Sequence, residues 1–229
     1  MKIAVIQHRL RTHERMDLAA MLAASERAAE DGVQVLVYPR IPGITAHVGL
    51  LDAFFRNVEE RAPGMARVSP ATRRREGGPL ESHLTGLGRT LVLAGDDCID
   101  PDLFERIQQL ECDALVWLFD AEDPLQAEAA LELALDASLR LAPLVIVAAV
   151  TGRARGLSGH GIGAIVYLGE IVSEGDPGDE LLTARVPAPA GLVERPRRLP
   201  ELAPILLQRL AAHRAHDVCT DRDQGEPPY

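Results

Sequence analysis

The sequence is nearly free of lysine. Among its 229 residues, arginine supplies 23 of the 24 basic side chains, and Lys2 is the only lysine. A phosphate-binding loop, a Schiff base and a lysine general base each need a lysine close to the reacting group. The sequence therefore excludes these three kinds of site, unless Lys2 itself serves.

Aromatic residues and positive net charge are also scarce. Phe, Trp and Tyr make up 3% of the chain, and the formal net charge is -10. Nucleic acids and anionic membranes repel such a protein, and nucleic-acid bases find few rings on which to stack. We therefore expect neither nucleic acid nor membrane as a partner. Apolar residues make up 47%, which is enough for a buried core.

Paired cysteines and long apolar runs are absent from the sequence. Cys98, Cys112 and Cys219 form no C-x-x-C pair and no metal-ligand spacing, which is typical of a reduced protein. The longest apolar run, residues 141–150, is far shorter than the ~20 residues of a membrane helix. We expect a cytoplasmic protein that holds no metal and no cofactor.

Short apolar runs alternate with longer amphipathic segments over the first two thirds of the chain. The expected strands are 2–7, 33–38, 89–94, 114–119 and 144–150, and the expected helices are 12–30, 48–61, 101–110 and 124–141. Buried apolar strands joined by helices form parallel sheets that helices cover. Either one mixed sheet or two stacked sheets would accommodate this α/β pattern.

Two regions break the alternation. Residues 62–88 contain three prolines, five glycines and three consecutive arginines, so we predict a loop there. Three strand-like runs joined by short turns predict a C-terminal β-meander, over 162–168, 170–174 and 181–186. We expect a final helix at 200–213, a single domain over 1–213, and a polar tail at 214–229.

Segments along the chain resemble, in order, the nitrilase (carbon–nitrogen hydrolase) superfamily. Residues 33–39 are similar to the family's apolar strand that ends in Phe-Pro-Glu. Residues 91–104 are similar to its nucleophile segment, a strand followed by Cys-x-Asp and, three residues on, Pro-Glu-Leu-Phe. Residues 159–160 and 168–171 resemble its Gly-His-Ser strand and its Gly-Glu turn. The resemblance covers roughly residues 1–186.

The resemblance implies an α-β-β-α sandwich with mixed sheets, usually paired as a homodimer. It also implies a Glu-Lys-Cys triad that hydrolyses nitriles or non-peptide amides. Here the three triad positions hold Arg40 for the glutamate, Glu81 for the lysine and Gly95 for the cysteine. The aspartate two residues after the cysteine is kept as Asp97, and Lys2 lies at the wrong end of its strand.

Elementary chemistry agrees with a loss of hydrolysis. Glycine has no nucleophile, and arginine stays protonated, so Arg40 cannot act as a general base. The sequence therefore favours a catalytically inactive pseudoenzyme that serves as a small-molecule-binding or interaction module. Its remnant pocket would be bounded by Arg40, Glu81, Gly95 and Asp97. Arg40 would hold an anionic small molecule there, and would pair with Glu81 if the two side chains meet.

Two alternatives remain open at this point. One is an active amidase-type hydrolase with a rearranged site, in which Cys98 or Ser158 is the nucleophile and His160 or His83 is the base. Against Cys98, several nearby aspartates would raise its thiol pKa and disfavour the thiolate. The other is a structural or regulatory subunit that uses the family's dimerising surface.

Acidic residues cluster after two of the expected strands, at Asp96, Asp97 and Asp100 and at Asp120, Glu122 and Asp123. If they faced one crevice, they would suit a hard cation such as Mg²⁺. However, Asp100 and Asp123 each precede a proline at an expected helix start, where carboxylates cap exposed N–H groups. We therefore predict helix caps there and no metal site.

Overall fold

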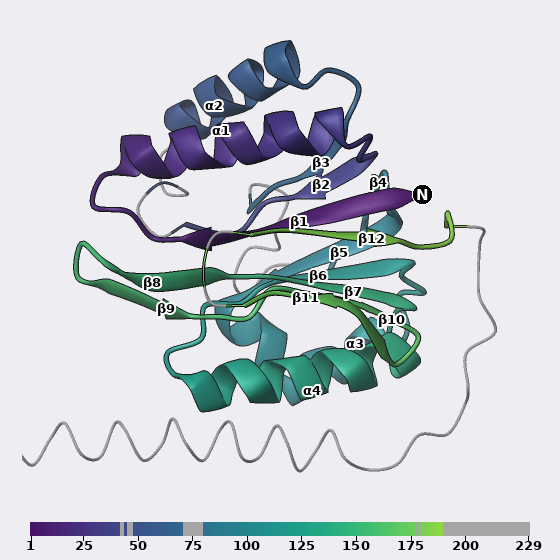
Figure 1. Cartoon of the computed structure of the whole chain (residues 1–229). Helices are drawn as coiled ribbons and strands as arrows, with labels where there is room; N and C mark the ends of the chain where they lie inside the picture. Colours follow the sequence, from purple (N-terminus) through teal and green to yellow (C-terminus); the bar gives the residue numbers. More distant parts are fainter. Residues whose placement is uncertain (42–43, 45–47, 71–79, 177, 179, 190–229) are drawn as a thin grey trace, which may run out of the picture.

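Twelve strands and four α-helices make up the part of the chain that the computed structural model describes, which is residues 1–189 apart from 42–43, 45–47, 71–79, 177 and 179. Two sheets stack face to face, and helices cover the outer face of each (Figure 1). In this part of the chain no helix is long and apolar enough to cross a membrane. The helix predicted at 200–213 and the tail at 214–229 lie outside the described residues.

The first sheet has the strand order β3-β2-β1-β8-β9, and β12 also pairs with β1. Its members are β1 (Lys2–Arg9), β2 (Val35–Val37), β3 (Ala66–Val68), β8 (Val150–Ala154), β9 (Leu157–His160) and β12 (Glu180–Arg185). Strands β1, β2 and β3 run parallel. Along most of its length β1 pairs antiparallel with β12, and its last residues pair parallel with β8.

The second sheet has the order β11-β10-β7-β6-β5-β4. Its members are β4 (His83–Thr85), β5 (Gly88–Ala94), β6 (Ala114–Leu118), β7 (Leu144–Ala148), β10 (Ala164–Tyr167) and β11 (Glu170–Glu174). The three central strands, β5, β6 and β7, are parallel, as predicted. An antiparallel strand borders them on each side, so the sheet is mixed.

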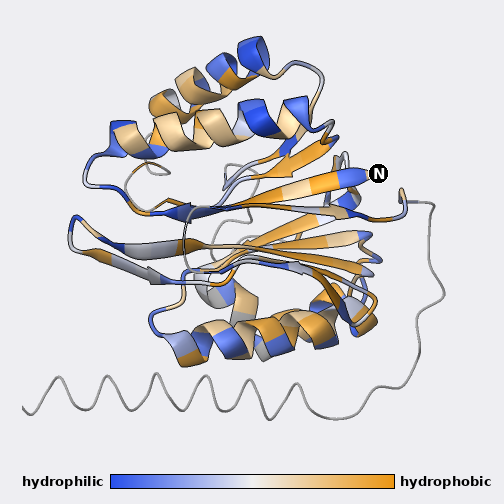
Figure 2. Ribbon diagram, viewed as in Figure 1, coloured by the Kyte–Doolittle hydropathy of each residue, from blue (hydrophilic) through white to orange (hydrophobic). Residues whose placement is uncertain are grey.

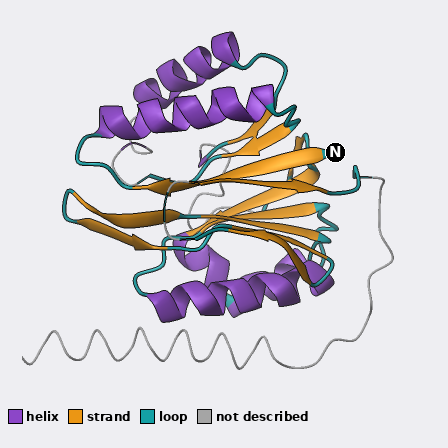
Figure 3. Cartoon of the chain, in the orientation of Figure 1, coloured by secondary structure: helices purple, strands orange, loops and turns teal. Residues whose placement is uncertain are grey.

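Helices α1 (Glu14–Glu30) and α2 (Val48–Arg61) lie outside the first sheet, and α3 (Pro101–Ile107) and α4 (Pro124–Arg140) lie outside the second (Figure 3). On β1, Ile3 and Val5 face the second sheet, whereas Ala4 and Ile6 face the helices. Because both faces of such strands are buried, the strands are apolar without alternation. The apolar residues accordingly line the strands between the helical layers (Figure 2). This arrangement is the α-β-β-α sandwich that the sequence predicts.

Three local predictions differ from the structure. Residues 62–88 hold two short strands, β3 and β4, where we predicted only loop. The run 144–150 divides at Ala149, since β8 leaves the second sheet and joins the first. The predicted meander is only the hairpin of β10 and β11, because β12 pairs with β1 and buries Leu182 and Ala184 between the two sheets.

Candidate functional site

Arg40 joins the two sheets at the edge where β2 and β6 end. It follows β2 of the first sheet, and its Nε lies 3.0 Å from Oδ2 of Asp120, which follows β6 of the second sheet. The Arg40 side chain is 33% exposed and that of Asp120 is 23% exposed. The ion pair is therefore open to solvent on one side, and it holds the guanidinium in a defined place.

Gly95 lies beside this guanidinium, directly after β5. A Cβ atom built on Gly95 would have Arg40 Nη1 at 3.9 Å and no other heavy atom of the described residues within 4 Å, apart from its chain neighbours. The φ angle of Gly95 is +58°, a left-handed conformation that side chains disfavour. Among the described residues, the place that the resemblance assigns to a nucleophile is therefore bordered by a cation and otherwise open.

Cys98 lies under this site and is fully buried, in the short 3₁₀ helix that Gly95 begins. Burial raises the pKa of its thiol well above the usual range, and the charges of Asp97 and Asp120 raise it further. Arg40 and a hydrogen bond with the Leu118 backbone lower it by less. The sequence predicted that nearby aspartates raise the pKa of the Cys98 thiol, but it did not reveal that burial raises this pKa more. Cys98 is therefore a buried thiol whose raised pKa favours the protonated form.

Glu81 does not pair with Arg40. It is exposed just before the edge strand β4, and in the described part of the chain the ion-pair partner of Arg40 is Asp120. This corrects the predicted Arg40–Glu81 pair. The Glu81 side chain is exposed to solvent. His83, an alternative base, is exposed on β4 itself.

Strand β9 brings His160 close to the site through its backbone. The His160 N–H donates to the carbonyl oxygen of Ala121 at 3.2 Å, next to Asp120. The side chains of Ser158 and His160 are both exposed, and within the described residues no hydrogen bond joins them. A serine nucleophile needs a base within hydrogen-bond reach, so this strand lacks the arrangement that the alternative hydrolase requires.

The acidic residues near the site serve the helices that follow. Asp100 Oδ1 accepts a hydrogen bond from the Leu103 N–H at 3.4 Å, and Asp123 Oδ1 accepts one from the Gln126 N–H at 2.9 Å. These contacts match the predicted helix caps. Among residues 1–189, as far as they are described, no group of three or more His, Cys, Asp or Glu side chains is arranged to hold a metal ion.

Lys2 lies at the other end of the sandwich. Its Nζ donates to the Asp31 carbonyl oxygen at 2.7 Å, at the carboxyl end of α1. It stands at the start of β1, whereas the site lies where the parallel strands end. The lone lysine therefore stabilises a helix terminus.

A buried polar cluster at the end of β1 was not predicted from the sequence. Asp17 of α1 is fully buried, and its Oδ1 lies 2.8 Å from His8 Nε2 and accepts the Arg11 N–H at 2.9 Å. Its Oδ2 lies 2.8 Å from Arg155 Nη2. Asp17 therefore ties α1 and β1 to the β8–β9 hairpin, whose last residue borders the site. The one signal in the sequence was that the expected strand 2–7 ends in polar residues, with His8 directly after Gln7.

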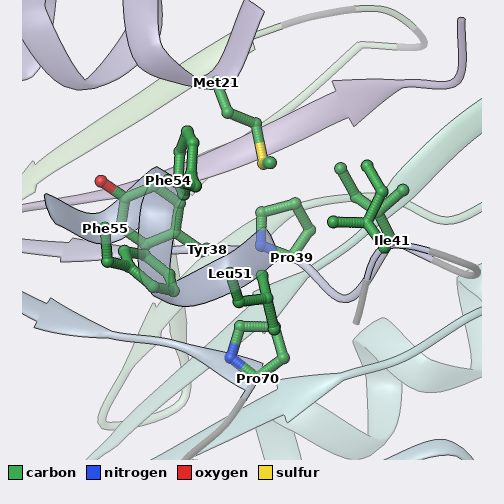
Figure 4. Close-up of a pocket in the computed structure, with 9 residues that line it drawn as sticks. Met21, Tyr38, Pro39, Ile41, Leu51, Phe54, Phe55 and Pro70 are labelled. Carbon is green, nitrogen blue, oxygen red and sulfur yellow. The ribbon is translucent and has the colours of Figure 1, made fainter. Parts of the chain in front are cut away.

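An apolar cavity lies beside the segment that follows β2, and Pro39 and Ile41, the chain neighbours of Arg40, line it (Figure 4). Its wall consists of residues from α1, α2 and the segments that follow β2 and β3, namely Met21, Tyr38, Pro39, Ile41, Ile44, Leu51, Phe54, Phe55 and Pro70. The Tyr38 hydroxyl and Ser25 Oγ are 2.8 Å apart, and burial raises the Tyr38 pKa to about 12. The rings of Tyr38, Phe54 and Phe55 pack edge to face. This packing fixes the strand end from which Arg40 extends.

Comparisons with known proteins match the fold of the chain but not its sequence. No family model and no curated protein matches it. A mutant amidase from Nesterenkonia sp. AN1 with acrylamide added at its active-site cysteine superposes with a TM-score of 0.63, at 19% identity, over 94% of this chain and 99% of that one. Two other mutants of this amidase, one described as a nitrilase-superfamily member and one in complex with butyramide, also reach 0.63 at 18% identity. They span 94% of this chain and 97% and 96% of theirs. The chain therefore has the nitrilase-like fold that the sequence predicts.

Proposed function

We propose that this chain keeps the fold of nitrilase-superfamily amidases without their hydrolytic chemistry, and that it binds a small anionic molecule where Arg40, Gly95 and Asp120 meet. One observation carries the proposal. The Arg40 guanidinium borders open space above a residue that has no side chain. A cation beside a vacant nucleophile position is suited to hold a ligand and not to attack it.

The absence of hydrolysis follows from the groups near the site. Amide hydrolysis through a covalent intermediate needs an ionised thiol or an activated hydroxyl, with a base close by. Gly95 supplies neither, and the thiol of Cys98 is buried and protonated. Lys2, the only lysine, caps α1 at the opposite end. An active amidase is the second candidate, favoured by the fold it would share with the solved amidases.

A carboxylate is the ligand that best complements Arg40. The Asp120 carboxylate lies against Nε of Arg40. In the described part of the chain, Nη1 and Nη2 of Arg40 make no hydrogen bond. The outer edge of the guanidinium can therefore donate two hydrogen bonds to a ligand carboxylate. The carboxylates of Asp97 and Asp120 are close enough to act on the Cys98 thiol. They add negative charge around the cation, so a ligand with one negative charge is favoured over a polyanion.

Ligand-induced stabilisation tests the proposal. A carboxylate that binds only the folded state at ten times its Kd adds about 1.4 kcal/mol to the free energy of unfolding. We expect acetate or butyrate, titrated at constant ionic strength, to raise the Tm of the wild type and not of Arg40→Ala. Arg56→Ala, on the exposed face of α2, is the matched control and keeps the shift. Equal shifts in both variants, or none in the wild type, would contradict the proposal.

The proposal includes the homodimer that the resemblance implies. A dimer would place two such sites on one particle of twice the 24.8 kDa chain mass. Light scattering after size-exclusion chromatography measures this mass directly. A particle with the mass of one chain over the micromolar range would remove the dimer from the proposal and leave the ligand site untouched.

A further inference from the structure

The start of β1 and the end of β12 place two cations opposite each other. Lys2 and Arg185 are partners in the antiparallel register of these strands. Side chains alternate along a strand, and the neighbours Ile3 and Ala184 both face the second sheet. The side chains of Lys2 and Arg185 therefore share the other face, beside the carboxyl end of α1 (Figure 1).

This pair of like charges destabilises the two strands. Cations directly opposite each other on a sheet repel, and in a chain whose net charge is -10 two facing cations run against the composition. In the described part of the chain, no carboxylate forms an ion pair with either side chain. Lys2 Nζ donates to the Asp31 carbonyl oxygen at 2.7 Å, and its other N–H groups are left for a further acceptor. An anion between Lys2 and Arg185 would remove the repulsion.

The two cations border a hollow between the carboxyl end of α1 and the starts of β1 and β2. Its volume is about 400 Å³, and it is lined by Met1, Lys2, Asp31, Gly32, Gln34 and Arg185. This volume lies within the range of about 300–1,000 Å³ that is usual for small-molecule pockets. The carboxylate of Asp31 is the one acidic group in its wall, against two basic side chains.

Hydrogen-bond donors from neighbouring strands face this hollow. Arg185 is exposed, and nothing in the described part of the chain pairs with its guanidinium. Gln34 Oε1 accepts the Lys2 backbone N–H at 3.0 Å, and among the described residues its amide nitrogen has no acceptor. The amino group of Met1 also lies here and donates to a backbone carbonyl oxygen. The wall therefore offers ammonium, guanidinium and amide N–H groups to an anion with several oxygen atoms.

We propose that this hollow binds a phosphate group, either as free phosphate or as the phosphomonoester of a small organic molecule. A phosphate dianion offsets both cations, since the Arg185 guanidinium donates paired hydrogen bonds and the Lys2 ammonium acts as a point charge. The Asp31 carboxylate and the negative end of the α1 dipole act against an anion, so binding requires both cations together. The hollow lies where β1 starts, and it is independent of the carboxylate site at Arg40, where the parallel strands end.

Calorimetric titration of the full chain with glycerol 3-phosphate tests the proposal, with glycerol as the neutral control. We expect the wild type to bind the phosphate ester and not glycerol. Arg185→Gln and Lys2→Gln should each weaken binding about tenfold or more, because each removes charge-assisted hydrogen bonds. Lys2→Arg keeps the charge and should retain most of the affinity. Arg56→Gln, on the exposed face of α2, and Arg40→Ala should bind as the wild type does.

Inorganic phosphate, titrated in parallel, distinguishes the two sources of the phosphate group. Equal affinities for inorganic phosphate and glycerol 3-phosphate would mean that the hollow recognises the phosphate alone. A weaker affinity for inorganic phosphate would identify the organic ester as the ligand.

Urea denaturation with and without phosphate gives a second measurement. In chloride buffer, Arg185→Gln should be at least as stable as the wild type, because it removes the repulsion from Lys2. In phosphate buffer of the same ionic strength the order should reverse. Phosphate also stabilises proteins in general by exclusion from their surface, so only the difference between the two proteins counts.

Three results would overturn the proposal. The first is no binding of glycerol 3-phosphate or inorganic phosphate by the wild type. The second is equal binding by the wild type, Arg185→Gln and Lys2→Gln. The third is a wild type that is more stable than Arg185→Gln already in chloride, because the arginine would then have a structural partner.

Discussion

Arg40 and Asp120 form an ion pair between the two sheets, with 3.0 Å between Nε and Oδ2. Each residue follows the carboxyl end of a parallel strand, one from each sheet. Because both side chains are partly exposed, the pair contributes about 1 kcal/mol or less to stability. Its main consequence is positional, since it holds the guanidinium beside Gly95.

A thiol placed at position 95 would report the charge of Arg40. In Gly95→Cys the new side chain starts 3.9 Å from Arg40 Nη1 and is open to solvent. A nearby cation lowers a thiol pKa, so we expect iodoacetamide at pH 7 to modify this thiol much faster than the buried Cys98. Peptide-resolved mass spectrometry measures both rates. The φ of +58° also predicts a loss of about 1–2 kcal/mol in stability.

The control for this experiment is the same substitution combined with Arg40→Ala. Without the guanidinium, the thiol at position 95 should react more slowly, because Asp97 and Asp120 then dominate the local charge. A rate that is unchanged by Arg40→Ala would contradict the placement of Arg40 beside Gly95.

Asp17 is the buried charge on which the β8–β9 hairpin depends. Asp17→Asn keeps the shape of the side chain but removes the charge that His8 and Arg155 contact. We expect the free energy of unfolding to fall by about 3 kcal/mol, as when one partner of a buried ion pair is removed. Urea denaturation measures this change. Asp52→Asn, on the exposed face of α2, should change it by less than about 0.5 kcal/mol, and a similar loss in both variants would argue against the buried cluster.

We expect the protein to lose stability at alkaline pH because the phenol of Tyr38 is buried. Its phenol keeps its proton up to about pH 12 in the folded state, because burial raises the pKa, whereas the unfolded phenol releases it near pH 10. Above pH 10 deprotonation therefore favours the unfolded state, at a cost of about 1.4 kcal/mol by pH 11. Tyr38→Phe should remove this part of the pH dependence. It should cost only about 1 kcal/mol at pH 8, for the hydrogen bond with Ser25.

The comparison also includes the same substitution at a tyrosine elsewhere in the chain. Tyr167→Phe, on β10 next to the edge strand β11, is this comparison variant. Urea unfolding at pH 8 and pH 11 should show a smaller difference for Tyr38→Phe than for the wild type and Tyr167→Phe. If all three proteins lose the same stability, the phenol of Tyr38 is not the group responsible.

The elements that the sequence predicts correctly are those with strong periodicity. The helix expected at 48–61 is α2, with the same bounds, because Leu51, Phe54 and Val58 recur on one face and are buried there. Strands β3 and β4 were missed because three residues carry no usable period. The transfer of β8 to the first sheet was missed because one apolar run, 144–150, supplies strands to both sheets.

For the candidate site too, the features set by local sequence were predicted, whereas a contact between residues far apart in the chain was not. The resemblance placed Arg40 and Gly95 at corresponding strand ends, and the structure places them side by side. The resemblance could not identify Asp120 as the partner of Arg40. That contact joins residues 80 positions apart, and the sequence contains many other acidic residues. Glu81 was chosen by a local match of sequence, and its exposed position on the rim was set by the short strand β4 that no pattern indicated.

Ammonia release from amides and nitriles tests the central claim most directly. Acetamide, butyramide, acrylamide and acetonitrile would be incubated with the wild type and with Cys98→Ala, and ammonia would be measured against a buffer control. We predict no release above buffer with either protein, because the site has no ionisable nucleophile that a substrate reaches. Turnover by the wild type that disappears in Cys98→Ala would contradict this account and establish an active hydrolase.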